Sequence, residues 1–276
     1  KIPDSELAKI TEVISSYSTK FNNGQVDRSS NIRLAASILD GRILLPGESF
    51  SFNRLVGRRT AAGGFKTAGV LVNGRKEYDI GGGICQVSTT LYNAAVFADL
   101  KITARSPHSR PVPYVPIGRD AAVSFPQPDL GFTNVLDTPI AISAEVGRGV
   151  IEFKILGQKE EELEIKIVQG GVSTAANGVK YVEDSSLGYG VEKVIESGSS
   201  RRTMTTYKIT MRNGREVGRE TLNSSLYRGS PRIIARNSKA TPTAPPAEGS
   251  FVPSGSQAPG GSGSSSSPGE PTPPGL

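Results

Sequence analysis

The sequence predicts an α+β domain over residues 1–160, a small, elongated all-β domain over 161–237 and a disordered tail over 238–276. Three observations predict this order. Helical and strand periodicities alternate along the first segment, whereas the two-residue period of strands runs alone through the second. Pro, Gly and Ser dominate the third segment, which leaves too little apolar surface to offset the chain entropy lost on folding. A chain of 276 residues has room for two domains.

Helices and short strands are interspersed in the first segment. Apolar side chains at helical spacing predict one helix over residues 4–17 and a second over 31–41, which Gly41 closes. Residues 42–53 predict a strand, a Pro-Gly turn and a second strand. Strands are also expected on both sides of the Asn73-Gly74 pair, which is a strong hairpin signal. Four short β patterns follow, in the order ITARS, AAVSF, IAISAEV and VIEFKIL.

Strand patterns alone fill the second segment. The runs ELEIKIVQG, RRTMTTYKITMRNG and REVGRETLNSSLY alternate with the strand period, and Asn213-Gly214 lies between two of them as a hairpin signal. Short strands punctuated by glycine give little core for their length, so we expect an extended sheet. Because the segment holds neither Cys nor His, we expect it to supply no catalytic residue.

Composition narrows the classes of function. The net charge of +6 is scattered in short basic groups, with no long basic run interleaved with aromatics, so nucleic acid is not an expected partner. Attraction to an anionic bacterial surface polymer fits the charge equally well, as does an ordinary solvated face. No stretch approaches the roughly 20 apolar residues that span a bilayer. The start of the chain, KIPDSELAKI, lacks a signal-peptide pattern, so either the protein is cytosolic or Lys1 is a processed or artificial start.

Cys85 and His108 are the only cysteine and the only histidine in the chain. A lone thiol cannot form an internal disulfide, and one Cys with one His provides too few ligands for a structural zinc site. We therefore expect no metal and no cofactor. A cysteine with a histidine elsewhere in the chain is instead the smallest set that can supply a thiolate nucleophile and its base.

The residues around Cys85 predict its place in the fold. Three glycines, 81–83, precede the run QVSTTLYNAAVFA, whose apolar residues have helical spacing. Cys85 is thus expected at the N-terminus of a helix, where free N–H groups and the helix dipole favour a thiolate and could hold an oxyanion. The alternative is that Cys85 is a small buried hydrophobe, as free cysteines often are.

Several blocks carry a family resemblance. The runs NIRLAASILDGRILLPGESFSFN, GGGICQVSTTLYNAA, RSPHSRPVPYVPIGRDAAV and DLGFTN resemble the VanW domain over about residues 18–155. The later run VEDSSLGYGVEKVIESGSSRRTMTTYKITMRNG resembles the G-five domain, a small β module of bacterial surface proteins. The pairing implies an exported protein, extracellular and located in the cell wall or on the outer face of the membrane.

The resemblance also implies an activity. Some VanW-type proteins act as L,D-transpeptidases of peptidoglycan, with their cysteine in the block that matches GGGICQ, which here contains Cys85. G-five domains are thought to bind polymers that contain N-acetylglucosamine. The expected partners are therefore peptidoglycan stem peptides and glycan strands, and attachment to a membrane would need a segment outside this sequence.

Candidate roles follow for the neighbouring residues. Cys85 would attack the stem amide, His108 would act as its base, and Asp120 would orient His108 or, equally, serve as a turn carboxylate. We expect the substrate-binding residues around this centre to be Gly83, Gln86, Ser88, Arg105 and Arg110. The two arginines flank His108 and could clamp a stem carboxylate, or could be exposed charges on a strand. Gln86 and Ser88 could donate hydrogen bonds to the substrate or cap the helix.

Two other functions fit the same residues. A cysteine amidase or peptidase would share the thiol chemistry and use water as the acceptor. A non-catalytic wall-binding or adhesion protein would keep Cys85 as a packing residue and bind through the β domain.

Overall fold

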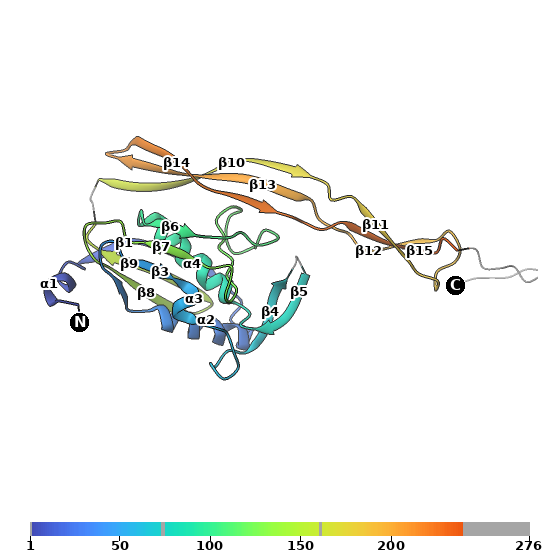
Figure 1. The fold of residues 1–276 in the computed structure, drawn as a ribbon, viewed down its shortest axis with the longest axis horizontal. Coiled ribbons are helices and arrows are strands. Elements are labelled where there is room, and N and C mark those ends of the chain that lie inside the picture. Colours follow the sequence, from blue (N-terminus) through green and yellow to red (C-terminus); the bar gives the residue numbers. More distant parts are fainter. Residues whose placement is uncertain (1, 73–74, 160–161, 240–276) are drawn as a thin grey trace, which may run out of the picture. The chain divides into compact units, whose positions relative to one another are not determined.

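The computed structural model describes residues 2–72, 75–159 and 162–239. Among them it has four helices, drawn in Figure 1: α1 Asp4–Leu7, α2 Val26–Leu39, α3 Phe52–Val56 and α4 Ile84–Phe97. Helices and strands are mixed up to Phe97, and only strands, turns and irregular segments follow, both in residues 98–159 and in the described part of 162–239. No helix in these described ranges is long and apolar enough to cross a bilayer.

A four-stranded antiparallel sheet underlies the first part of the chain. Its order is β1-β9-β8-β2, with β1 Glu12–Lys20, β2 Arg42–Leu44, β8 Ile140–Gly147 and β9 Val150–Gly157. The helix expected over 4–17 is therefore wrong beyond Leu7. Residues 12–20 pair with β9 along their whole length, and Ser15 and Thr19 reach inward to bond α4. This strand pairing outweighs the local helical spacing of the apolar residues.

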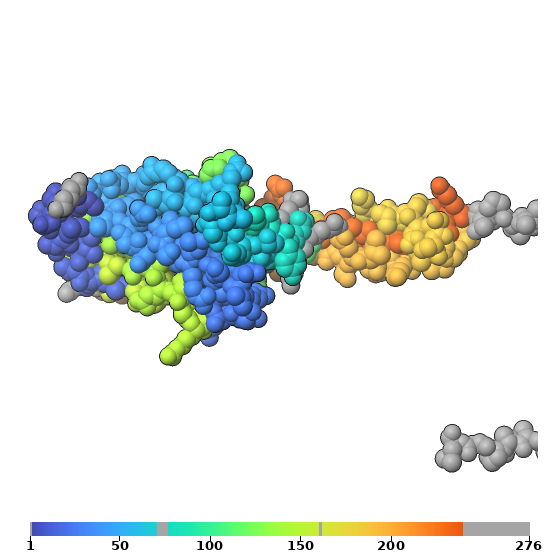
Figure 2. Space-filling view, turned by 90° about the horizontal axis from the view of Figure 1, so that it is seen from below, coloured from blue at the N-terminus to red at the C-terminus, as the bar shows by residue number. Residues whose placement is uncertain are grey.

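Two helices cover this sheet. Helix α4 packs against β1 and β9, and α2 packs against β8, α4 and β4; Figure 1 shows them beside the sheet. Figure 2 shows α2 in blue adjoining the turquoise β4–β5 hairpin on one face of the molecule. The predicted second helix is confirmed, starting earlier at Val26 and followed by Gly41 at a φ of 71°. The fully buried core side chains include Ile32, Leu39, Leu91, Val96, Ile142, Ile151, Phe153 and Ile155.

Two small sheets complete the first part. The order β3-β7-β6 joins β3 Ser49–Ser51, β6 Lys101–Ala104 and β7 Gly131–Thr133, while β4 Thr67–Val72 and β5 Arg75–Ile80 form a hairpin. The register of that hairpin pairs Val72 with Arg75, but the turn residues 73–74 lie outside the described residues. The expected AAVSF strand is reduced to a single bridge between Ser106 and Ala122.

The β-only part contains two three-stranded sheets, β10-β13-β14 and β11-β15-β12. Their strands are β10 Leu163–Ala175, β11 Val179–Glu183, β12 Glu192–Glu196, β13 Arg201–Arg212, β14 Arg215–Tyr227 and β15 Arg232–Arg236. The predicted Asn213-Gly214 hairpin is confirmed, with φ values of 50° and 72°. Residues up to Ser238 pack as one unit. The domain boundary at 160–161 and the tail from 240 onward fall outside the described residues and stay predictions.

Candidate active site

The glycine-rich loop places Cys85 at the start of α4. Gly83 is the residue before the helix and has a φ of 105°, a conformation that glycine adopts without strain. A side chain on Gly82 would come within 2.7 Å of the backbone of Ala68 and Gly69, so this glycine lets the loop lie against β4. Cys85 is the second residue of the helix, the position that the glycine pattern predicts. Its side chain is half-buried.

Buried polar residues of α4 hold a second segment beside the thiol. Ser88 Oγ donates to the carbonyl oxygen of Ala121 at 2.7 Å, and Thr89 Oγ1 accepts from the Ala121 N–H at 3.0 Å. One turn further on, Asn93 Nδ2 donates to the carbonyl of Arg119 at 2.9 Å. The Cys85 thiol donates to the carbonyl of Val123 at 3.4 Å. Asp120 is thereby fixed next to the N-terminal half of the helix.

Cys85, His108 and Asp120 form one interacting cluster. The charges of His108 and the Cys85 thiol act on each other. His108 Nδ1 lies 2.6 Å from Asp120 Oδ2, and the same oxygen accepts from the His108 backbone N–H at 2.7 Å. Two bonds from one residue to one carboxylate oxygen fix the ring orientation, which leaves Nε2 as the nitrogen available to the thiol. The side chains of His108 and Asp120 are 7% and 1% exposed.

The charges of this cluster favour a thiolate beside an imidazolium. Burial lowers the pKa of His108, but the hydrogen bonds from Asp120 and Cys85 outweigh it and raise the pKa to about 9. Burial likewise opposes ionisation of Cys85, yet the hydrogen bond and charge of His108, with a further contribution from Arg59, lower the pKa of the thiol. The pKa of Asp120 is also lowered, because its bonds to His108 and the charge of Arg105 outweigh its burial.

The β-only part contributes to this cluster. Tyr227, at the end of β14 and 1% exposed, donates its hydroxyl to Asp120 Oδ1 at 2.5 Å and accepts from the Gly118 N–H at 2.7 Å. Arg105 donates to the same Asp120 oxygen at 3.1 Å and to Ser225 Oγ at 2.7 Å. Residues 161–237, which we expect to supply no catalytic residue, therefore contact the residues that surround His108. They supply a positioning residue, although none that touches the thiol.

We expect Tyr227→Phe to lower the free energy of unfolding by about 1.5–3 kcal/mol, because a buried carboxylate loses a charged hydrogen bond. Chemical denaturation would measure this change. Tyr181→Phe is the matched control, since Tyr181 is 45% exposed on β11. Equal stabilities of the two variants would contradict the role given to Tyr227.

Four of the expected substrate-binding side chains are occupied by internal contacts. Arg105 is 4% exposed and its donors go to Asp120, Gly118, Asn223 and Ser225, so it supports Asp120 and does not clamp a substrate carboxylate. Arg110 Nη2 bonds Ser230 Oγ at 2.5 Å, while its buried Nε has no hydrogen-bond partner among the described residues. Gln86 is 1% exposed, and Ser88 is fully buried against Ala121. Neither Gln86 nor Ser88 reaches a surface that a substrate could touch.

Three residues that act on the thiol are not predicted from the sequence. Arg28 and Arg59 are half-buried cations whose charges act on Cys85. Burial, together with the Cys85 charge, raises the pKa of Tyr114, so its hydroxyl is neutral at physiological pH. In the sequence, Arg28 lies in VDRSS, Arg59 in VGRR and Tyr114 in PVPYV. The VGRR group resembles scattered surface charge, and nothing else in these runs marks the three residues.

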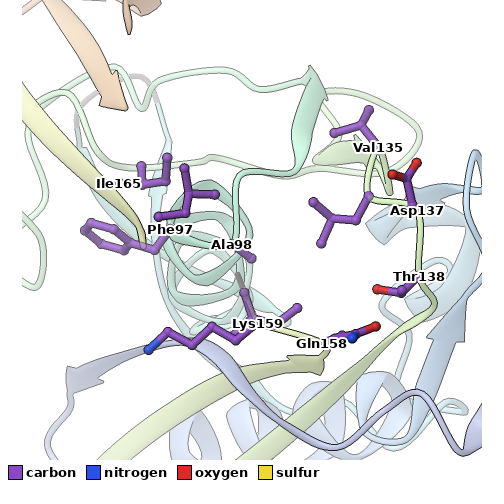
Figure 3. A pocket seen from close by; sticks show the side chains of 11 residues that line it. Phe97, Ala98, Val135, Asp137, Thr138, Gln158, Lys159 and Ile165 are labelled. Carbon is purple, nitrogen blue, oxygen red and sulfur yellow. The ribbon is translucent and has the colours of Figure 1, made fainter. Parts of the chain in front are cut away.

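A separate hollow of about 400 Å³ lies away from the thiol. Figure 3 shows Phe97, Ala98, Val135, Asp137, Thr138, Gln158, Lys159 and Ile165 around it. None of the predicted site residues lines this hollow. Within the described ranges, no group of three or more His, Cys, Asp or Glu side chains is arranged to hold a metal ion.

These features define a mixed helix–strand region with a Cys-His-Asp cluster, joined to a β-only region. The family model described as "VanW like protein" matches residues 27–156, and the G5 domain model matches residues 172–239. The chain therefore contains a VanW-like domain followed by a G5 domain, which confirms the resemblance seen in the sequence.

Two curated proteins are similar to this chain. The uncharacterized protein YoaR of Bacillus subtilis (strain 168) is 47% identical over 146 residues, which are 52% of this chain and 48% of that protein. The vancomycin B-type resistance protein VanW of Enterococcus faecalis (strain ATCC 700802 / V583) is 30% identical over 175 residues, 62% of this chain and 61% of that protein. The matches thus span about half and about three fifths of these relatives.

Two solved G5 structures were also found. HP0197-G5 is 17% identical, with a TM-score of 0.19, and the match covers 28% of this chain and 99% of that structure. The G5 domain of an IgA1 protease is 22% identical, with a TM-score of 0.23, and the match covers 29% of this chain and 95% of that structure.

Proposed function

We propose that this protein is a cell-wall-associated cysteine acyl transferase, an L,D-transpeptidase that acts on the tetrapeptide stems of peptidoglycan outside the cell. The observation that carries the proposal is the cluster in which His108 is hydrogen-bonded to Asp120 and interacts with the Cys85 thiol. It contains a nucleophile, a base and an orienting carboxylate in the order that acyl transfer by a thiol requires. Similarity to a vancomycin-resistance protein supports the assignment to cell-wall chemistry.

The first half of the reaction forms a thioester. The Cys85 thiolate attacks the carbonyl carbon between the L-centre of the third stem residue and the terminal D-Ala. The Cys85 backbone N–H, which has no acceptor among the described residues, would bind the oxyanion. His108 then gives its proton to the amide nitrogen, the C–N bond breaks, and D-Ala leaves as the free amino acid.

The second half transfers the acyl group. Neutral His108 takes a proton from the side-chain amine of a second stem, and the amine attacks the thioester carbonyl. The C–S bond breaks, which restores the thiolate and the imidazolium and leaves a new amide crosslink. Water in place of the amine would release the tripeptide, which is the amidase or peptidase outcome.

The G5 domain would hold the enzyme on glycan strands. Tyr181 and Tyr189 are 45% and 66% exposed, and the Arg236 guanidinium lies 4.4 Å from the Tyr181 ring centroid. Exposed aromatic faces of this kind are typical of binding surfaces. Binding there would raise the local concentration of stems. The same surface favours the second candidate, a glycan-binding wall protein without turnover.

Mass spectrometry distinguishes these functions. A disaccharide-tetrapeptide incubated with the full chain should lose D-Ala and yield a crosslinked dimer, whereas a tripeptide alone would identify a hydrolase. Cys85→Ala is the control for contaminating activity. Absence of any product, together with binding to sacculi, would favour the wall-binding protein.

The thiol itself gives a test that needs no substrate. At pH 6.5 we expect Cys85 to react with iodoacetamide at least about tenfold faster than in the unfolded chain, where about 1% of an ordinary thiol is ionised. The reaction reports one site, because the chain has one cysteine. The same protein in denaturant is the control, and equal or slower reaction of the folded protein would contradict the thiolate.

A further inference from the structure

Two arginines lie against the glycine loop that leads to Cys85. A β-carbon on Gly81 would come within 3.0 Å of Cβ and Cγ of Arg59, and one on Gly83 within 3.0 Å of Cγ of Arg28. The glycines therefore let the aliphatic stems of both arginines pack directly on the loop. The charges of both guanidinium groups act on the Cys85 thiol.

Arg59 is held in place with part of its hydrogen-bonding capacity unused. Its Nη1 donates to Asn53 Oδ1 at 2.8 Å and to the Gly57 carbonyl at 2.9 Å, and its guanidinium lies 5.4 Å from the Phe52 ring centroid. Its Nη2 is buried and has no acceptor among the described residues. A buried donor without a partner is costly, which suggests that a ligand completes it.

Neither arginine is neutralised by a carboxylate of the described chain. Arg28 Nη2 donates to the neutral amide oxygen of Gln86 at 2.8 Å. The charge of Asp129 acts on Arg59, but its oxygens accept from Ser51 Oγ at 2.6 Å and from the Asn53 N–H at 2.9 Å, and no ion pair with Arg59 forms. Two positive groups thus act on the thiol without a carboxylate of the described chain to neutralise them.

We propose that Arg28 and Arg59 bind the terminal carboxylate of the donor stem, and so restrict the enzyme to amides one residue from a free C-terminus. This inference rests on the proposed function. In the donor, only the amide nitrogen and one α-carbon separate the scissile carbonyl from the D-Ala carboxylate. A guanidinium that bonds this carboxylate would therefore set the carbonyl next to Cys85. The carboxylate leaves with D-Ala, which vacates the site for the acceptor.

The test compares one tetrapeptide with a free D-Ala carboxylate and the same peptide ending in D-alaninamide. With the full wild-type chain, we expect kcat/KM to be about 100-fold higher for the acid, the size of a strong charged hydrogen bond. Arg59→Gln should reduce this ratio to a few-fold, and Arg59→Lys should keep part of it, because charge remains without the fork geometry. Loss of Arg59 also affects the thiol, and this lowers kcat/KM equally for both peptides. The ratio of the two kcat/KM values therefore isolates the effect on the carboxylate.

Arg54→Gln is the matched control, since Arg54 lies on α3, five positions before Arg59, and is exposed; it should leave the ratio unchanged. Equal use of acid and amide by the wild type, or an unchanged ratio in Arg59→Gln, would overturn the carboxylate site. If the wild type turns over neither peptide, the proposed function fails. Binding of the acid and amide peptides to Cys85→Ala, measured by calorimetry, then tests the carboxylate site separately. Tighter binding of the acid than of the amide, lost when Arg59→Gln is added, supports the carboxylate site. Equal binding of the two peptides, or no binding, refutes the site.

Discussion

Cys85→Ala is expected to reduce release of D-Ala from a tetrapeptide stem by about 10⁴-fold or more, to the background of the uncatalysed reaction. No other thiol exists in the chain to take over the attack. The fold should survive, because the side chain is small and, apart from its interaction with His108, makes one weak hydrogen bond, to Val123. Turnover by mass spectrometry and melting by circular dichroism measure the two effects.

Cys85→Ser separates nucleophilicity from shape. A serine hydroxyl fits the same space but is far less ionised at neutral pH, so this variant should be nearly as inactive as alanine. Substantial turnover in either variant would remove Cys85 from the mechanism. A large loss of stability in both would instead indicate that the residue is a packing element of the core.

His108→Gln is expected to reduce turnover by about 10³-fold or more, because it removes both the proton donor for the leaving amine and the cation that lowers the pKa of Cys85. In the wild type, activity should decline above about pH 9, where the imidazolium loses its proton. Glutamine cannot titrate, so this alkaline limb should be absent from any residual activity. A pH–rate profile of both proteins provides the measurement.

His108 also makes the stability of the fold depend on pH. The pKa of His108 is about 9 in the folded protein and 6.5 for an ordinary histidine, so protonation stabilises the fold fully below about pH 6.5. This contribution disappears as the pH rises through about 9. The difference in unfolding free energy between wild type and His108→Gln should therefore shrink between pH 7 and pH 10. A constant difference would show that the imidazolium is not stabilised by Asp120 and Cys85.

Local signals were sufficient to find the centre of the candidate site. The glycines at 81–83 require a loop before a helix, and this places Cys85 at the helix N-terminus. A chain with one Cys and one His offers a single pair to consider, and Asp120 lies in the next block of the sequence. The three side chains come together because Ser88 and Thr89 bind the backbone beside Asp120.

The surroundings of that centre depend on long-range packing, which periodicity does not reveal. Tyr227 is 107 positions from Asp120, and nothing in its alternating strand pattern marks it as a partner of a buried carboxylate. The roles of Arg105 and Arg59 were misassigned or missed for the same reason, since an arginine in a short basic group looks the same whether it is solvated or buried. The strand over residues 12–20 was missed because its partner, β9, lies far along the chain.

The bond from Tyr227 to Asp120 has a consequence for protein engineering. The border near residue 160, between the mixed helix–strand region and the β-only region, looks like a natural place to cut the chain when the cysteine-bearing region is fused to another protein. Such a transplant would leave the Asp120 carboxylate without Tyr227 and Arg105 without Ser225. Buried charges that lose their partners are strongly destabilising. The smallest unit to transfer therefore extends through Ser238, and a fusion protein should join its new segment after that residue.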